Sequence, residues 1–157
     1  MKRLKYTLLT ILTFAGATLS AAVSAQSTDA IEVTRAAVQT ERKAIVAAAM
    51  GLSEQESQAF WPVYNDFRAE MNKIIDRHVR LIRDFAAHYN SLSDEKAKAM
   101  VAEYLSIQKA KLKLRQRYVR KFEKVLPPKK VMRYYQTENK LDALINVQLA
   151  REIPLAK

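Results

Sequence analysis

Large apolar side chains recur at alternating intervals of four and three residues in the segment from Ser53 to Asn90. The series consists of Phe60, Tyr64, Phe67, Met71, Ile74, His78, Leu81, Phe85 and His88. Residues three and four apart share one face of a helix, whereas a strand alternates at every second residue. The pattern therefore predicts one long amphipathic helix, whose apolar face must be covered by a second helix.

Local signals place the ends of this helix at about 54–89. Ser53 and Glu56 have the capping-box spacing that is typical of a helix start. Pro62 lies well inside the helix, where its ring removes a backbone donor, so we expect a bend at this position. A short separate helix that ends before Trp61 is the alternative.

A second apolar series of the same period follows between residues 94 and 126. It consists of Val101, Leu105, Gln108, Leu112, Arg115, Val119, Phe122 and Leu126. A turn at Asn90–Ser93 would bring His78 near Leu105 and Phe67 near Arg115. The two helices are thus predicted to form a long antiparallel hairpin.

Shorter helices are predicted on either side of the hairpin, at about 30–50 and 129–152. Gly51 can end the first by adopting a left-handed conformation, and Pro127-Pro128 separates the third from the fourth. Glu138 falls among the apolar positions of the fourth helix, where a carboxylate needs a partner. The candidate partners are Arg115, Arg120 and Arg133. With only two glycines in 157 residues, the chain is predicted to be all-α, with four helices built on the hairpin.

The first 25 residues have the composition of a secretory signal peptide. Three basic residues precede an apolar run from Leu8 to Val23, and small residues end the segment at Ala25. Cleavage after Ala25 would leave one helical domain, 26–157. An uncleaved membrane anchor is the alternative, although polar residues dilute the run. A chain without cysteine is then most simply a protein of the bacterial periplasm, and export argues against a nucleic-acid partner.

Positive charge dominates the sequence. The formal net charge is +11, and removal of the signal would leave about +8. Ten basic residues and one acidic residue, Glu123, lie between Lys109 and Lys130. Apolar and aromatic side chains are interspersed with these cations, so this segment is a candidate surface for unfolded clients or other partners. The candidate residues are Tyr104, Lys109, Lys113, Leu114, Arg117, Tyr118, Lys121 and Lys124. Burial of the apolar ones by the fourth helix or a second subunit is the alternative.

No arrangement of residues in the sequence indicates a catalytic, cofactor or metal site. The two histidines, His78 and His88, are about 15 Å apart along one helix and cannot bind the same ion within a monomer. Zinc would need a ligand from another element or from another subunit, for example Glu103 beside His78. We therefore expect a protein that is not an enzyme and that has no cofactor.

Two short motifs resemble the Leu-Thr-x-x-Gln repeats of the Spy/CpxP family of periplasmic stress proteins. The motif residues are Leu52, Ser53, Glu54, Gln55, Leu92, Ser93, Asp94 and Glu95. Serine replaces threonine in both copies, and Glu56 and Lys96 stand where the family has glutamine. Phe60–Tyr64, Leu126–Lys130, Glu138–Leu141 and Ile153–Leu155 look more closely like an exported bacterial group that we associate with that superfamily.

The resemblance implies a four-helix, commonly dimeric protein that acts as an ATP-independent chaperone or a regulator of the envelope stress response. We expect it to bind unfolded or envelope proteins and to form a homodimer. An anionic membrane surface is a further possible partner. The alternatives are a metal-responsive or regulatory sensor of a membrane partner and a structural protein of the membrane surface. The sequence identifies neither the client nor the stress pathway.

Overall fold

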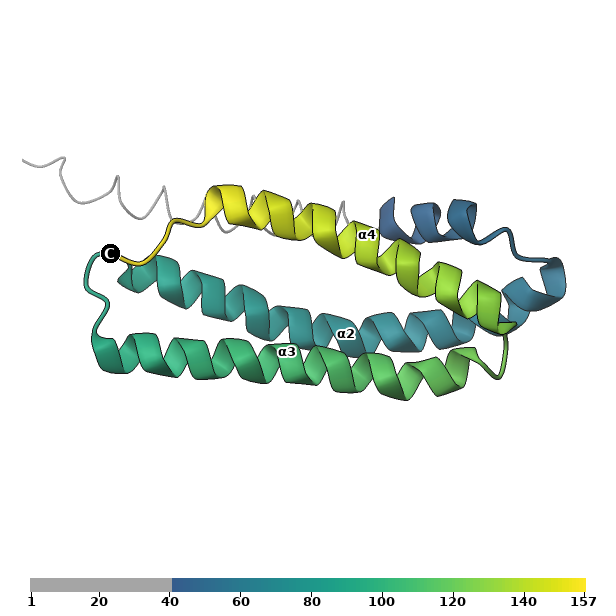
Figure 1. Cartoon of the computed structure of the whole chain (residues 1–157), viewed down its shortest axis with the longest axis horizontal. Coiled ribbons are helices and arrows are strands. Elements are labelled where there is room, and N and C mark those ends of the chain that lie inside the picture. Colours follow the sequence, from purple (N-terminus) through teal and green to yellow (C-terminus); the bar gives the residue numbers. More distant parts are fainter. Residues whose placement is uncertain (1–40) are drawn as a thin grey trace, which may run out of the picture. The chain divides into compact units, whose positions relative to one another are not determined.

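The computed structural model describes residues 41–157, a region that contains helices and no strand (Figure 1). Residues 41–50 are helical, and three longer helices follow: α2 (Glu54–His88), α3 (Asp94–Phe122) and α4 (Pro128–Glu152). The predicted all-α class with four helices is therefore confirmed. The predicted signal peptide at 1–25 and the predicted start of the first helix near residue 30 lie outside the described residues.

Helix α2 begins at the capping box that the sequence predicts. The Ser53 hydroxyl accepts a hydrogen bond from the Glu56 N–H at 3.2 Å, and the Glu56 carboxylate accepts one from the Ser53 N–H at 2.8 Å. The helix then continues through Pro62 to His88. The alternative of a short separate helix that ends before Trp61 is therefore wrong, while the bend at Pro62 stays a prediction.

Helix α3 begins in a related way, since the Ser93 hydroxyl accepts a hydrogen bond from the Lys96 N–H at 3.2 Å. Both Leu-Ser motifs thus lie at helix starts, where their serines have a structural role as caps. The end of α3 is four residues earlier than predicted. The N–H groups of Lys124 and Val125 bond to carbonyls three residues back, which tightens the chain ahead of Pro127.

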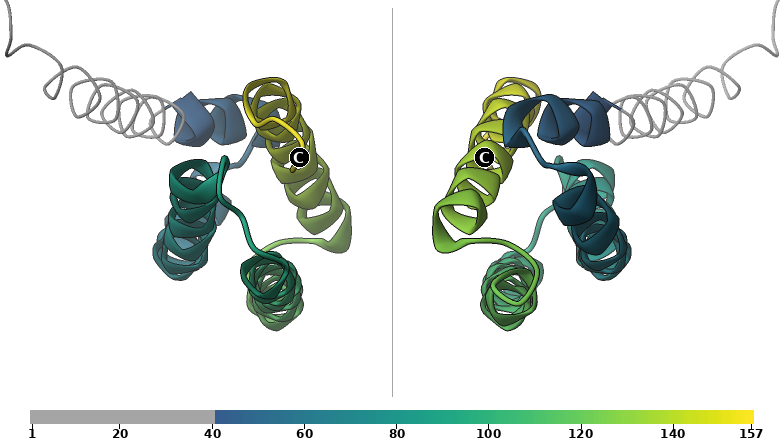
Figure 2. Two further views of the ribbon diagram at one scale, coloured as in Figure 1. Left: turned by 90° about the vertical axis from the view of Figure 1, so that its left-hand side faces the viewer. Right: turned by 90° about the vertical axis from the view of Figure 1, so that its right-hand side faces the viewer.

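Helices α2 and α3 lie side by side and run in opposite directions, which Figure 1 shows along their length and Figure 2 from the two ends. Polar bonds join the two helices along their length. The Arg77 guanidinium donates to both carboxylate oxygens of Glu103 at 3.0 and 2.9 Å, and Lys96 forms an ion pair with Asp84 at 2.8 Å. The Tyr118 hydroxyl donates to Glu70 at 2.7 Å, farther from the turn.

The core is concentrated at the end of the hairpin where α4 begins. Six aromatic rings form its centre, and the Phe122 and Tyr134 rings are closest, with centroids 4.6 Å apart. The six residues are Phe60, Tyr64, Phe67, Tyr118, Phe122 and Tyr134. Val46, Met50, Leu126 and Val131 complete the packing around them. This end therefore holds α2, α3 and α4 together through burial of large rings.

The half of the hairpin nearest the turn is packed less completely. The last fully buried residue of α2 is Met71, and the side chains of its apolar face beyond that point are only partly buried. In α3, Ile107 is the one buried residue on the N-terminal side of Leu114. Apolar surface thus remains accessible along the part of the hairpin that lies away from the core.

The face of α3 that packs against α2 differs from the prediction. Ile107, Leu114 and Tyr118 are buried there, in place of Leu105 and Leu112. Phe67 accordingly packs against the Tyr118 ring, at 5.2 Å between centroids, and not near Arg115. The helix is therefore rotated about its own axis relative to the predicted arrangement, although the antiparallel pairing is correct.

Glu138 is buried, as its position among apolar residues predicts, but its partner was predicted wrongly. Arg68 of α2 approaches Glu138 Oε2 with Nη1 at 3.3 Å. Arg115, one of the predicted partners, binds Asp142 of α4 at 2.6 Å instead.

Candidate binding surface

Helix α3 exposes a row of large apolar side chains that no described part of the chain covers. Val101 is 60% exposed, Leu105 59% and Leu112 55%. They are four and seven residues apart, so they lie on one face of the helix. We call these three residues the outer stripe. Single exposed apolar residues are common on soluble proteins, whereas a row of them along one helix indicates a binding surface.

Exposed cations occur along the same helix, and we call Lys98, Lys109, Lys113 and Arg120 the basic line. Across residues 41–157, none of these four side chains forms an ion pair with a carboxylate. Their spacing, in multiples of a helical turn, keeps them on one side of α3.

Other cations of α3 are used in holding the fold together. Lys96 is paired with Asp84, Arg117 with Glu70, and Arg115 with Asp142. The paired cations thus bind α2 or α4, whereas the basic line has no carboxylate partner in the described part of the chain. The positive charge of the basic line is therefore available to an external partner.

Six of the eight residues predicted for a partner surface are accessible. Tyr104, Lys109, Lys113 and Lys124 are exposed. Arg117 is exposed but holds the Glu70 carboxylate, and the Lys121 ammonium lies 4.2 Å from the centre of the Tyr118 ring. The last two therefore contribute to the hairpin as well as to the surface.

The other two predicted surface residues, Leu114 and Tyr118, are buried, so their assignment to the surface is wrong. Both fall on the face of α3 that packs against α2. Burial and the hydrogen bond to Glu70 raise the pKa of Tyr118 to about 12, and the same hydrogen bond is the main reason why the pKa of Glu70 is lowered. This hydroxyl is therefore a structural donor.

Sequence reasoning missed the outer stripe because it assigned all three residues to the interior of the hairpin. The available signal was that α3 carries two apolar series, one through Leu105 and Leu112 and one through Ile107 and Leu114. A helix paired with one partner buries only one such series. The second series was therefore a sign of an additional binding face.

A histidine and a lysine lie close together on the inner side of the hairpin. The His78 ring is 6.1 Å from the Tyr104 ring, measured between centroids. Burial lowers the pKa of His78, and the nearby charge of Lys111 lowers it further. Burial also lowers the pKa of Lys111. The apolar and positively charged surroundings thus favour the neutral form of the His78 imidazole.

Glu103 was the example of a zinc ligand beside His78, and Arg77 binds both oxygens of this carboxylate. Within the described part of the chain, histidines and carboxylates form no group of three that could hold a metal ion.

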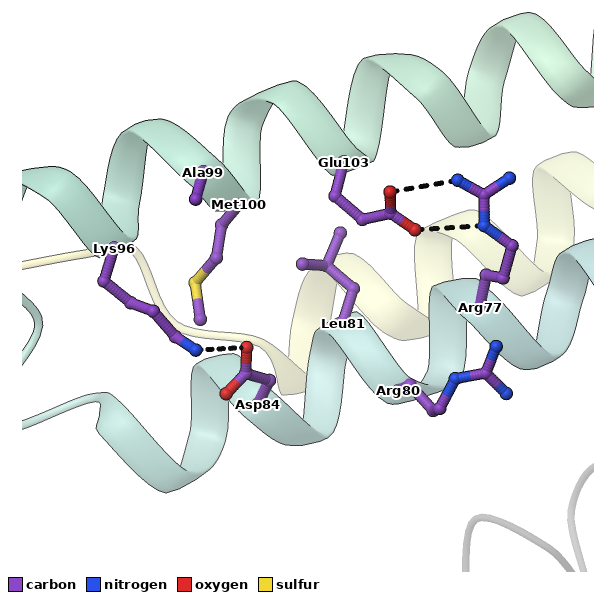
Figure 3. A pocket seen from close by; sticks show the side chains of 8 residues that line it. All are labelled: Arg77, Arg80, Leu81, Asp84, Lys96, Ala99, Met100 and Glu103. Carbon is purple, nitrogen blue, oxygen red and sulfur yellow. Dashed lines mark hydrogen bonds and ion pairs between the residues drawn. The ribbon is translucent and has the colours of Figure 1, made fainter.

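A shallow groove of about 420 Å³ lies at the edge of the hairpin near the turn (Figure 3). It is lined by Arg77, Arg80, Leu81, Asp84, Lys96, Ala99, Met100 and Glu103. The ion pairs Arg77–Glu103 and Asp84–Lys96 cross from one helix to the other within this lining. Most of its charged groups are thus satisfied by the hairpin itself, which makes the outer stripe the stronger candidate surface.

No protein-family model matches the chain, and the searches of curated proteins and of solved structures gave no match either. Among the helices of residues 41–157, none is both long enough and apolar enough to cross a membrane.

Proposed function

We propose that this protein is a non-enzymatic periplasmic binding protein, similar in role to the Spy/CpxP family, that holds partially unfolded envelope proteins without using ATP. The observation that supports this most directly is the outer stripe, which places exposed apolar side chains on the same helix as cations that have no carboxylate partner within residues 41–157. Unfolded chains expose apolar segments, and those of net negative charge are attracted by the basic line.

The size of the exposed surface suits weak and reversible binding. Full burial of a Val or Leu side chain contributes about 1.5–3 kcal/mol, so covering three half-exposed residues contributes only a few kcal/mol before entropy is lost. A helix face without a deep pocket also sets few demands on the shape of its ligand. Such a surface favours many clients and rapid release over tight recognition of one.

The proposal is tested by aggregation of a denatured acidic client, followed by light scattering at low salt. We expect the full mature chain to suppress aggregation at stoichiometric amounts. The triple variant Val101→Gln, Leu105→Gln, Leu112→Gln should need about tenfold more protein for the same effect, since a loss of 1.4 kcal/mol in binding is a factor of ten. Glutamine is a good helix former, so the variant should keep its fold.

A matched control is available on α4, where Leu144 is 69% and Val147 53% exposed. The double variant Leu144→Gln, Val147→Gln should suppress aggregation as well as the unmodified chain. No suppression by the unmodified chain would remove the chaperone proposal. Equal losses in both variants would show that the outer stripe is not the site.

An anionic membrane surface is the second candidate, because a helix with apolar side chains beside cations is also typical of interfacial binding. Flotation with vesicles that contain or lack anionic lipid tests it. Binding that requires anionic lipid and is lost in the outer-stripe variant would favour this candidate, provided that aggregation of the client is unaffected by the protein.

A further inference from the structure

The basic line follows the outer stripe along most of α3. From Lys98 to Arg120 it extends over about 33 Å at 1.5 Å per residue, and Val101, Leu105 and Leu112 lie within the same interval. The charged and apolar features therefore form one continuous strip rather than two separate patches.

The helical spacing of the residues in this strip favours a helical ligand over an extended one. The apolar residues are separated by one and two helical turns, and the cations by similar multiples. A partner helix repeats its side chains at the same period and can contact every member of the strip, whereas an extended strand repeats at every second residue. An amphipathic helix is therefore the conformation that fits best.

Charge decides which amphipathic helix can occupy the strip. A second copy of α3 on the same face would bring the two basic lines together, and like charges in contact disfavour association. A helix with Asp and Glu along one edge would instead pair with Lys98, Lys109, Lys113 and Arg120. The absence of carboxylate partners for these four within residues 41–157 leaves them available for that role.

We propose that the outer stripe and the basic line together dock an amphipathic helix with an acidic edge, supplied by another protein. Its apolar residues cover Val101, Leu105 and Leu112, and its carboxylates pair with the basic line. This inference rests on the proposed function and narrows its client class: the favoured segments are those that form helices before the rest of the client has folded.

The test uses three synthetic peptides of about 21 residues, long enough to follow α3 over roughly 30 Å. The first is an amphipathic helix with a glutamate edge, the second has the same composition in scrambled order, and the third carries lysine in place of glutamate. Fluorescence anisotropy with the full mature chain measures their binding. We expect the acidic helix to bind at least about tenfold more tightly than either other peptide and to weaken as salt is added.

Two charge variants distinguish an effect of the basic line on affinity from an effect of the protein's net charge. Lys109→Glu with Lys113→Glu should reduce the affinity for the acidic helix by about tenfold or more. Lys129→Glu with Lys140→Glu changes the net charge equally through exposed lysines of the α4 helix, and should leave the affinity nearly unchanged. Circular dichroism of each variant checks that the helices are retained.

Three results would overturn the inference. Equal binding of the scrambled peptide would show that composition alone is recognised, and equal binding of the lysine peptide would exclude the basic line. A dimer in sedimentation that dissociates in the Val101→Gln, Leu105→Gln, Leu112→Gln variant would make a second copy the occupant. Aggregation assays are run in parallel. Suppression of client aggregation without a preference for the acidic peptide rejects only this inference. Binding of the acidic peptide without suppression of aggregation rejects only the chaperone proposal.

Discussion

The Glu138 carboxylate is almost completely buried at the packed end of the molecule, where Arg68 approaches it at 3.3 Å. A buried ion pair contributes little when compared with two apolar residues, but removal of Arg68 takes away a contact that offsets the cost of burying this carboxylate. The pair thus ties α4 to α2 more strictly than apolar packing alone would.

We predict that Arg68→Met lowers the free energy of unfolding by about 3 kcal/mol, measured by urea denaturation. Arg77→Met is the control, because its partner Glu103 is partly exposed and water can replace the lost contact. The control should shift the midpoint only slightly. Shifts of equal size in the two variants would contradict the importance of burial at Glu138.

We expect His78 to make the stability depend on pH. Its pKa in the folded protein lies below the ordinary value of 6.5 because of burial and the charge of Lys111. As the pH falls from 6.5 toward the pKa of the folded state, the unfolded chain binds more protons at His78 than the folded chain does. The free energy of unfolding therefore falls as the pH is lowered. We predict a lower melting temperature at pH 5.5 than at pH 7.5, and a smaller difference in His78→Gln. An unchanged difference in the variant would assign the effect to another group.

Glu70 and Asp84, two carboxylates of the hairpin, do not contribute to the pH dependence in this window. The pKa values of Glu70 and Asp84 are lowered by their hydrogen bonds to Tyr118 and Lys96. Their stabilising effect is therefore complete above about pH 4.5 and is lost only at lower pH. The change between pH 7.5 and 5.5 is therefore not due to these two carboxylates, and the His78→Gln variant shows how much of it belongs to the histidine.

At the scale of the elements, helix bounds could be predicted because their signals are local. Ser53, Ser93 and Pro127 act on backbone groups within one helical turn of themselves, and the observed ends of α2 and α4 lie within one residue of the prediction. Only the end of α3 differed more, where bonds three residues back replace the last helical turn.

The face of α3 that enters the hairpin could not be predicted in the same way. Its two apolar series have similar size and period, so periodicity alone does not choose between them. Hydrogen bonds between residues far apart in the sequence choose the face that is buried. Among them are Arg77–Glu103 and Tyr118–Glu70, which orient α3 so that Ile107 and Leu114 face α2. Of the basic line, only Lys109 and Lys113 were among the predicted surface residues, and both are exposed, while Leu114 and Tyr118 were assigned to the surface and the outer stripe to the core.

At the scale of residues 44–157, stability and binding are assigned to different parts. The aromatic cluster around Phe122 and Tyr134 holds the helices together at one end of the hairpin. The outer stripe lies on α3 outside this cluster, so the binding that we propose there does not require the core to open. Substitutions in the stripe are accordingly expected to change binding much more than stability.

Cysteine labelling tests this division of α3 directly, since the chain has no native cysteine. A single cysteine is placed at Leu105 in the outer stripe, at Ile107 in the hairpin interface, or at Leu144 on α4, and its reaction with a thiol reagent is timed. We predict fast labelling at 105 and 144 and labelling about a hundredfold slower at 107, because a buried thiol reacts only when the structure opens. A denatured acidic client should then slow the reaction at 105 alone. A cysteine at 105 that is as protected as one at 107 before any client is added, or that reacts equally fast with and without client, would contradict the account.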